Sequence, residues 1–194
     1  MEDWDPELQL EDFPDELQAL LVEDVSELRD SFEQVQAMWA TTIERARNLP
    51  EEKLHESVDG QWSFVRTLRH LIYAIDTWVG RMIRDDERPF HPWGQPFSEY
   101  ADAAEDLSLD LEADPSLDEV LLVFNERVQG VRVQGVRDLL AGLSNTDLDR
   151  VCTPDDTTHP DAPHAVRICL WTVIEEGWWH NGFANRDLDA LGAP

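Results

Sequence analysis

Residues 169–191, CLWTVIEEGWWHNGFANRDLDAL, decide how the rest of this chain is organised. Apolar and small side chains recur in this stretch at helical spacing, which predicts a helix with one apolar face. Two ionisable residues, Glu176 and His180, interrupt that face. Because they are spaced i, i+4, their side chains point the same way one turn apart on a helix.

The Glu176 and His180 pair has two interpretations. A carboxylate and an imidazole one turn apart can bind a divalent metal ion from two sides, although a metal site needs further ligands. The alternative is a hydrogen bond between two buried side chains. The stretch by itself does not decide between them.

Three further helices are expected before this one, because apolar residues recur in steps of three and four over three long segments. The segments are Asp15 to about Asn48, Ser63 to about Asp85, and Ser116 to about Gly142. Ser63 is the expected N-cap of the second helix, and Ser116 with Glu119 forms a capping box at the start of the third. Long amphipathic helices without a run of strands predict an all-α fold, a four-helix bundle with long crossover connections.

A short repeat lies inside the third expected helix. Residues 128–132 and 133–137 both read VQGVR. Five residues turn an α-helix by about 140° beyond one full turn, so the repeat cannot keep one face in register. We therefore expect a bulge or kink between Gly130 and Gly135 within a continuous helix.

The chain is expected to divide into an acidic N-terminal arm, residues 1–14, and one bundle domain, residues 15–194. The arm contains two prolines and shows no lasting hydrophobic period. The connection 86–115 is long and rich in proline and aromatic residues. A loop of this length is rare inside a compact domain, so it should wrap the bundle or cover a site.

Composition limits the range of partners. The formal net charge is -27, which argues against binding to nucleic acid or to an anionic membrane. A signal peptide and a long apolar run are both missing from the sequence, which predicts a cytoplasmic protein. Trp171, Trp178 and Trp179 fall outside the apolar face of their helix, so aromatic surface could be buried in a homodimer.

A third candidate ligand lies on the second helix. His70 is at the edge of the apolar side, in a column with Thr67, Ala74, Thr77 and Arg81. Small and polar residues beside a core can line a pocket. A solvent-facing histidine is the alternative interpretation.

The second helix, WSFVRTLRHLIYAIDTW (62–78), and the fourth, VIEEGWWHNGFANRDL (173–188), resemble the two signature segments of the DinB-like superfamily of four-helix bundles, which includes the YfiT-type proteins. Members carry a divalent-metal site with one histidine on the second helix and two ligands four residues apart on the fourth. Matched by position, these ligands are His70, Glu176 and His180. Many relatives have histidine at the position of Glu176, but mycothiol-dependent maleylpyruvate isomerase resembles this chain in its His, Glu, His set.

The resemblance implies a function as well as a site. It implies a divalent metal, zinc first and nickel, manganese or iron as alternatives, and transfer of a low-molecular-weight thiol such as mycothiol or bacillithiol to an electrophilic substrate. Thr67, Thr77 and Arg81 would then lie in the thiol pocket. Two other functions stay open: a hydrolase that uses metal-activated water, and a non-enzymatic metal- or ligand-binding module.

Overall fold

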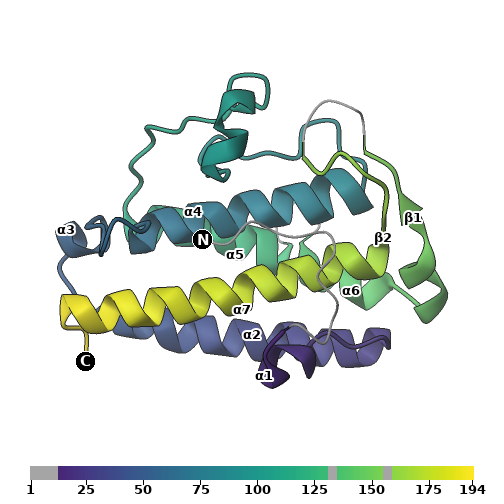
Figure 1. The fold of residues 1–194 in the computed structure, drawn as a ribbon, viewed down its shortest axis with the longest axis horizontal. Helices are drawn as coiled ribbons and strands as arrows, with labels where there is room; N and C mark the ends of the chain where they lie inside the picture. The colour runs from purple at the N-terminus through teal and green to yellow at the C-terminus, as the bar shows by residue number, and fades with distance from the viewer. Residues whose placement is uncertain (1–12, 131–134, 155–158) are drawn as a thin grey trace.

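The computed structural model describes residues 13–130, 135–154 and 159–194. It is all-α in character, as predicted, with four long helical segments arranged as a bundle (Figure 1). Most of the expected N-terminal arm lies outside the described residues. Phe13, at the start of the described chain, packs against the core.

The helices are α1 (Asp15–Gln18), α2 (Val25–Ala46), α3 (Glu51–Leu54), α4 (Phe64–Ile75), α5 (Leu117–Gln129), α6 (Val136–Gly142) and α7 (Val166–Leu191). A π-helical segment, Asp76–Ile83, continues α4, and single 3-10 segments cover Ser98–Ala103 and Asn145–Asp149. Two short strands, β1 (Val151–Cys152) and β2 (His164–Ala165), pair antiparallel ahead of α7. This small hairpin was not expected from the sequence.

Two expected helices are divided. The first long helix begins at Val25, because the Asp24 side chain caps it by accepting a hydrogen bond from the Ser26 amide at 2.8 Å. The third ends at Gln129, where Gly130 adopts a left-handed conformation with φ of 91°, and α6 starts at Val136. The expectation of a bulge inside one continuous helix was therefore wrong, since a left-handed glycine terminates a helix. Residues 131–134 of the VQGVR repeat lie outside the described residues.

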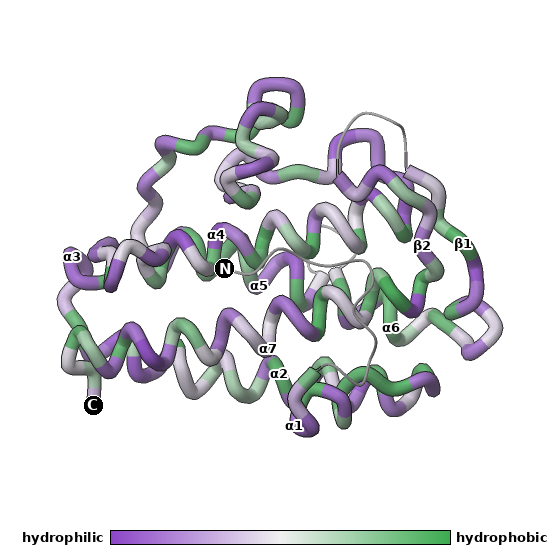
Figure 2. Tube along the Cα trace, viewed as in Figure 1, coloured by the Kyte–Doolittle hydropathy of each residue, from purple (hydrophilic) through white to green (hydrophobic). Residues whose placement is uncertain are grey.

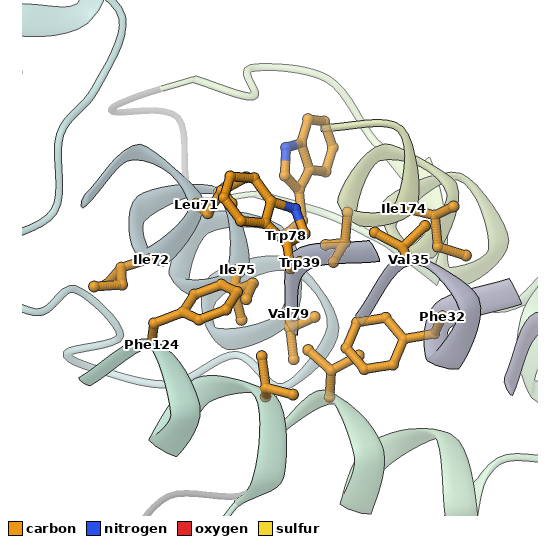
Figure 3. Close-up of a cluster of buried hydrophobic side chains, with 14 of the residues drawn as sticks. Phe32, Val35, Trp39, Leu71, Ile72, Ile75, Trp78, Val79, Phe124 and Ile174 are labelled. Atoms are coloured by element: carbon orange, nitrogen blue, oxygen red, sulfur yellow. The ribbon is translucent and has the colours of Figure 1, made fainter. Parts of the chain in front are cut away.

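The core lies between the facing sides of the four long helices. Hydrophobic and hydrophilic residues alternate along each of them, as an amphipathic helix requires (Figure 2). Figure 3 shows side chains from all four meeting in one cluster, among them Phe32, Val35, Trp39, Ile72, Ile75, Phe124 and Ile174. Burial of this apolar surface is the main stabilising contribution to the bundle.

Helices α2 and α7 make an unusually close contact at Gly177. The indole Nε1 of Trp39 donates a hydrogen bond to the Gly177 carbonyl oxygen at 2.8 Å. A Cβ atom at Gly177 would lie only 2.8 Å from Cγ1 of Val35, so a larger residue would push the helices apart. The contact fixes α7 at the residue that follows Glu176.

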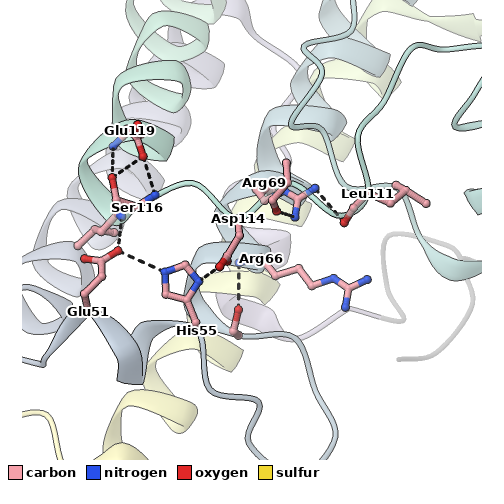
Figure 4. A network of polar contacts seen from close by, with 11 residues as sticks. Glu51, His55, Arg66, Arg69, Leu111, Asp114, Ser116 and Glu119 are labelled. Atoms are coloured by element: carbon pink, nitrogen blue, oxygen red, sulfur yellow. Dashed lines mark hydrogen bonds and ion pairs between the residues drawn. The ribbon is translucent and has the colours of Figure 1, made fainter.

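Hydrogen bonds from the buried guanidinium group of Arg69 hold the long connection 86–115 against the bundle. The Arg69 guanidinium donates hydrogen bonds to the carbonyl oxygens of Trp93 and Asp110 at 2.9 and 2.7 Å. Farther along, Asp114 pairs with His55 of the preceding connection at 2.7 Å, next to the capping box that starts α5 (Figure 4). The connection is therefore ordered by polar contacts to its backbone as well as by its aromatic side chains.

A buried ion pair joins three parts of the fold. Arg127 Nε of α5 donates to Oδ1 of Asp76 at 2.8 Å, and Oδ2 of Asp76 accepts from the His91 amide at 2.8 Å. Burial raises the pKa of Asp76 to about 6, and the Arg127 guanidinium limits that rise. The π-helical segment, α5 and the long connection thus meet at one carboxylate.

We expect Arg127→Met to lower the free energy of unfolding by about 3–5 kcal/mol, because it leaves the Asp76 carboxylate buried without its cation. Urea denaturation at pH 7 measures the change. The double variant Asp76→Asn/Arg127→Met should recover much of the loss, since it removes the buried charge and keeps an acceptor for the His91 amide.

The control is the more exposed pair of Arg137 and Glu33. Arg137→Met should change the free energy of unfolding by less than about 1 kcal/mol. Equal losses in the two single arginine variants, or a double variant less stable than Arg127→Met, would contradict the assignment of Asp76 as the buried charge.

Candidate metal centre

Three side chains from two helices converge at one side of the bundle. His70 projects from α4, and Glu176 and His180 project from α7. The carboxylate oxygen Oε2 of Glu176 lies 3.2 Å from Nε2 of His70 and 3.0 Å from Nε2 of His180. One potential ligand atom from each residue lies within 4.8 Å of the other two, so the group could hold a metal ion.

The backbone of the long connection determines which tautomer the neutral ring of His70 adopts. Its Nδ1 atom lies 2.8 Å from the carbonyl oxygen of Gln95. A carbonyl oxygen only accepts hydrogen bonds, so Nδ1 carries a hydrogen, and the neutral form of the ring has its lone pair at Nε2. Metal-binding histidines are commonly oriented in this way, by a hydrogen bond from the nitrogen that does not bind the metal.

The protonation of His70 creates an excess of acceptors at the centre of the group. In the neutral ring, Nε2 of His70 has no hydrogen and faces a Glu176 oxygen that is itself an acceptor, and His180 Nε2 faces the same oxygen. A single proton can satisfy only one of these contacts. A divalent cation satisfies all three ligand atoms together, so the donor set fits a metal ion.

The electrostatics of the group agree with this fit. Burial alone would raise the pKa of Glu176, but the contacts with the imidazoles of His180 and His70 outweigh it and hold the pKa well below the usual range. Burial lowers the pKa of His180, which keeps that imidazole neutral near pH 7. Ionised carboxylate and neutral imidazole are the forms that bind metal.

Two aromatic rings cover the group. The Trp62 ring centroid lies 4.8 Å from that of His70 and 6.1 Å from that of His180, and the Phe97 ring lies 4.3 Å from His70. Trp62 precedes the cap of α4, and Phe97 comes from the long connection. The sequence did not identify them as site residues, since no spacing rule links them to His70.

A cavity of about 1240 Å³ opens on the three candidate ligands. Of the residues expected in a thiol pocket, Thr67 and Thr77 line it. Arg81 does not contribute to its wall; Nη1 of Arg81 instead donates to the His159 carbonyl oxygen at 2.9 Å, and His159 does line the cavity.

The π-helical segment explains why Arg81 departs from the expected column. The column was drawn for an α-helix, in which each residue turns by about 100°. Arg81 lies within Asp76–Ile83, where hydrogen bonds span five residues and each residue turns less. The difference in rotation accumulates along the segment. It is small at Thr77, near the start, and large at Arg81, near the end.

A known protein family matches the part of the chain that contains the candidate metal ligands. A family model described as the DinB superfamily matches residues 34–184, a span that contains all three candidate ligands. No curated protein and no solved structure matched the chain. Within the described residues, none of the helices has the length and apolar character needed to cross a membrane.

We expect the chain, once stripped by a chelator, to bind one zinc ion per molecule in isothermal titration calorimetry. His180→Ala should weaken zinc binding by more than about 100-fold, because it removes one of three protein ligands. Affinity should fall at acid pH, since protonated imidazoles do not bind metal, and the loss should begin below the ordinary imidazole value of about 6.5 because burial lowers the pKa of His180.

The control is His91→Ala, which removes a histidine outside the cavity wall whose Nδ1 accepts a hydrogen bond from the Trp93 amide. This variant should bind zinc like the parent. Unchanged zinc affinity in His180→Ala would disprove the ligand assignment.

Proposed function

Because the chain belongs to the DinB superfamily, we propose that it is a metal-dependent S-transferase that joins a low-molecular-weight thiol, such as mycothiol or bacillithiol, to an electrophilic substrate. The observation that carries the proposal is a set of three ligands, one carboxylate and two imidazoles, that faces a large cavity. Three protein ligands are typical of catalytic zinc sites, whereas structural zinc sites are closed by four.

The donor set suits the activation of a thiol. Zinc held by these residues would lower the pKa of a thiol at its open position, so that the sulfur reacts as a thiolate near neutral pH. Nickel, manganese or iron also accept imidazole and carboxylate ligands. Glu176 supplies the only negative charge among the three ligands, so the site keeps a net positive charge that favours an anionic sulfur.

The protein's own thiols are poorly placed to act as the nucleophile. Cys152 and Cys169 are both buried, and the cavity wall formed by the described residues contains neither. Burial raises the pKa of Cys169 to about 12, so its thiolate is scarce at neutral pH. A separate low-molecular-weight thiol supplies what these side chains do not.

The cavity has room for two reactants. Pockets for a single small ligand usually have volumes of about 300–1,000 Å³. The 1240 Å³ cavity exceeds that range, and Trp62 and Phe97 shield the histidine ligands from water on one side. A thiol and an electrophile can therefore lie next to each other beside the candidate ligands.

The proposal also covers the location, the partners and the oligomeric state of the protein. A small-molecule thiol transferase of this kind acts in the cytoplasm, where such thiols are kept reduced. The net charge of -27 disfavours nucleic acid as a partner. Trp178 and Trp179 are only partly buried and provide aromatic surface for a homodimer.

We expect zinc-loaded protein to accelerate the reaction of mycothiol or bacillithiol with monobromobimane, and to lose that acceleration when either the metal or the thiol is left out. His180→Ala should lower the rate by at least about 100-fold while the helical circular dichroism stays unchanged, because a packed bundle does not depend on one ion. His91→Ala is the matched control and should keep the parent rate.

Three outcomes would redirect the proposal. An unchanged rate and unchanged metal content in His180→Ala would disprove both the ligand assignment and the metal-dependent mechanism. Thiol-independent cleavage of an ester or amide would identify a hydrolase instead. Loss of metal together with unfolding would make the site structural and favour a binding module.

A further inference from the structure

The cavity beside the candidate ligands is walled by aromatic rings. Near the ligands, Trp62 stacks on Phe97 with ring centroids 5.7 Å apart, and Trp179 stacks on Phe183 at 6.1 Å. Flat ring faces on several sides of one cavity are suited to a planar apolar ligand.

A second group of rings also lines the cavity. Tyr100, from the 3-10 segment, stacks on His159 at a centroid distance of 4.4 Å and an interplanar angle of 16°. Trp78, from the π-helical segment, meets the edge of His159 at 5.8 Å. Arg81 holds the His159 carbonyl, so this wall is fixed by elements that are far apart in the sequence.

Acidic residues outnumber lysine and arginine on the cavity wall. Among the described residues that line the cavity, Arg186 is the single one with a lysine or arginine side chain. Its Nε atom donates a hydrogen bond to Oδ1 of Asp187 at 2.7 Å. Glu99 adds a carboxylate to the wall beyond Glu176, whereas burial raises the pKa of Glu175 to about 8 and leaves that carboxyl largely uncharged at pH 7. An anionic ligand would therefore lose its hydration without gaining an unpaired side-chain cation, which is unfavourable.

We propose that the electrophile taken by this cavity is an uncharged aromatic compound, and that aromatic carboxylates and sulfonates are rejected. The inference rests on the proposed function for its chemistry, but the binding preference follows from the cavity wall. In the reaction, the thiol sulfur forms a bond to an electrophilic carbon of the aromatic compound. The leaving group departs with its bonding electron pair, and the thiol proton passes to water.

Two fluorescent probes that share their rings and differ in one charge test the binding preference. They are N-phenyl-1-naphthylamine, which is neutral, and 8-anilino-1-naphthalenesulfonate, which is anionic. Titrated into the full zinc-loaded chain, the neutral probe should bind at least tenfold more tightly. Equal or tighter binding of the sulfonate would overturn the inference.

A matched pair of variants tests the location. Tyr100→Leu removes a ring from the cavity wall and should weaken binding of the neutral probe several-fold. Trp93→Leu removes a larger ring that lies outside the cavity wall and should leave the affinity unchanged. Parent-like binding in Tyr100→Leu, or an equal loss in both variants, would place the probe elsewhere and contradict the inference.

Turnover separates this inference from the proposed function. 1-Chloro-2,4-dinitrobenzene and 4-chloro-3,5-dinitrobenzoate are a neutral and an anionic electrophile with the same leaving group. Faster thiol transfer to the neutral compound, relative to the uncatalysed rates, supports both the proposed function and the aromatic-substrate inference. Transfer that prefers the benzoate overturns the aromatic-substrate inference alone, whereas tight neutral-probe binding without any transfer overturns the proposed function alone.

Discussion

The hydrogen bonds that α4 makes to the backbone of the long connection are the constraint on which the site depends. Arg69 donates to carbonyl oxygens at both ends of the connection, and the next residue, His70, donates from Nδ1 to the Gln95 carbonyl. The first contact holds the connection in place. The second sets the hydrogen position on His70 and leaves Nε2 free to bind a metal. Loop order and ligand chemistry are therefore coupled through two adjacent residues.

The sequence was informative where local geometry decides the outcome. The i, i+4 spacing of Glu176 and His180 places both on one side of α7, and their side chains meet there. Ser63 and Ser116 cap α4 and α5 as their residue types predict. The role of His70 needed the resemblance to DinB-like proteins, because helical spacing alone allowed a solvent-facing histidine.

The features that the sequence did not reveal depend on the backbone or on distant pairing. The Gln95 contact uses a carbonyl oxygen, which every residue has, so no side-chain pattern could identify it. The contact of Tyr100 with His159 joins two connections, and no periodicity relates them. The change to π-helical hydrogen bonding after Ile75 gives no local signal either, yet it turns Arg81 away from the column that contains His70.

The carboxylates of Asp76, which is buried, and Glu176, which is partly buried, differ in whether the chain itself satisfies them. Asp76 has an arginine partner and a backbone amide donor, so both of its oxygens are satisfied within the chain. Glu176 faces two imidazoles, and the ring of His70 has already committed its hydrogen to Gln95. A partly buried carboxylate without a fixed cation is unfavourable, and the described contacts place no arginine or lysine against Glu176. A metal ion held by His70, Glu176 and His180 would supply the missing positive charge, so the same deficit favours metal binding at this site.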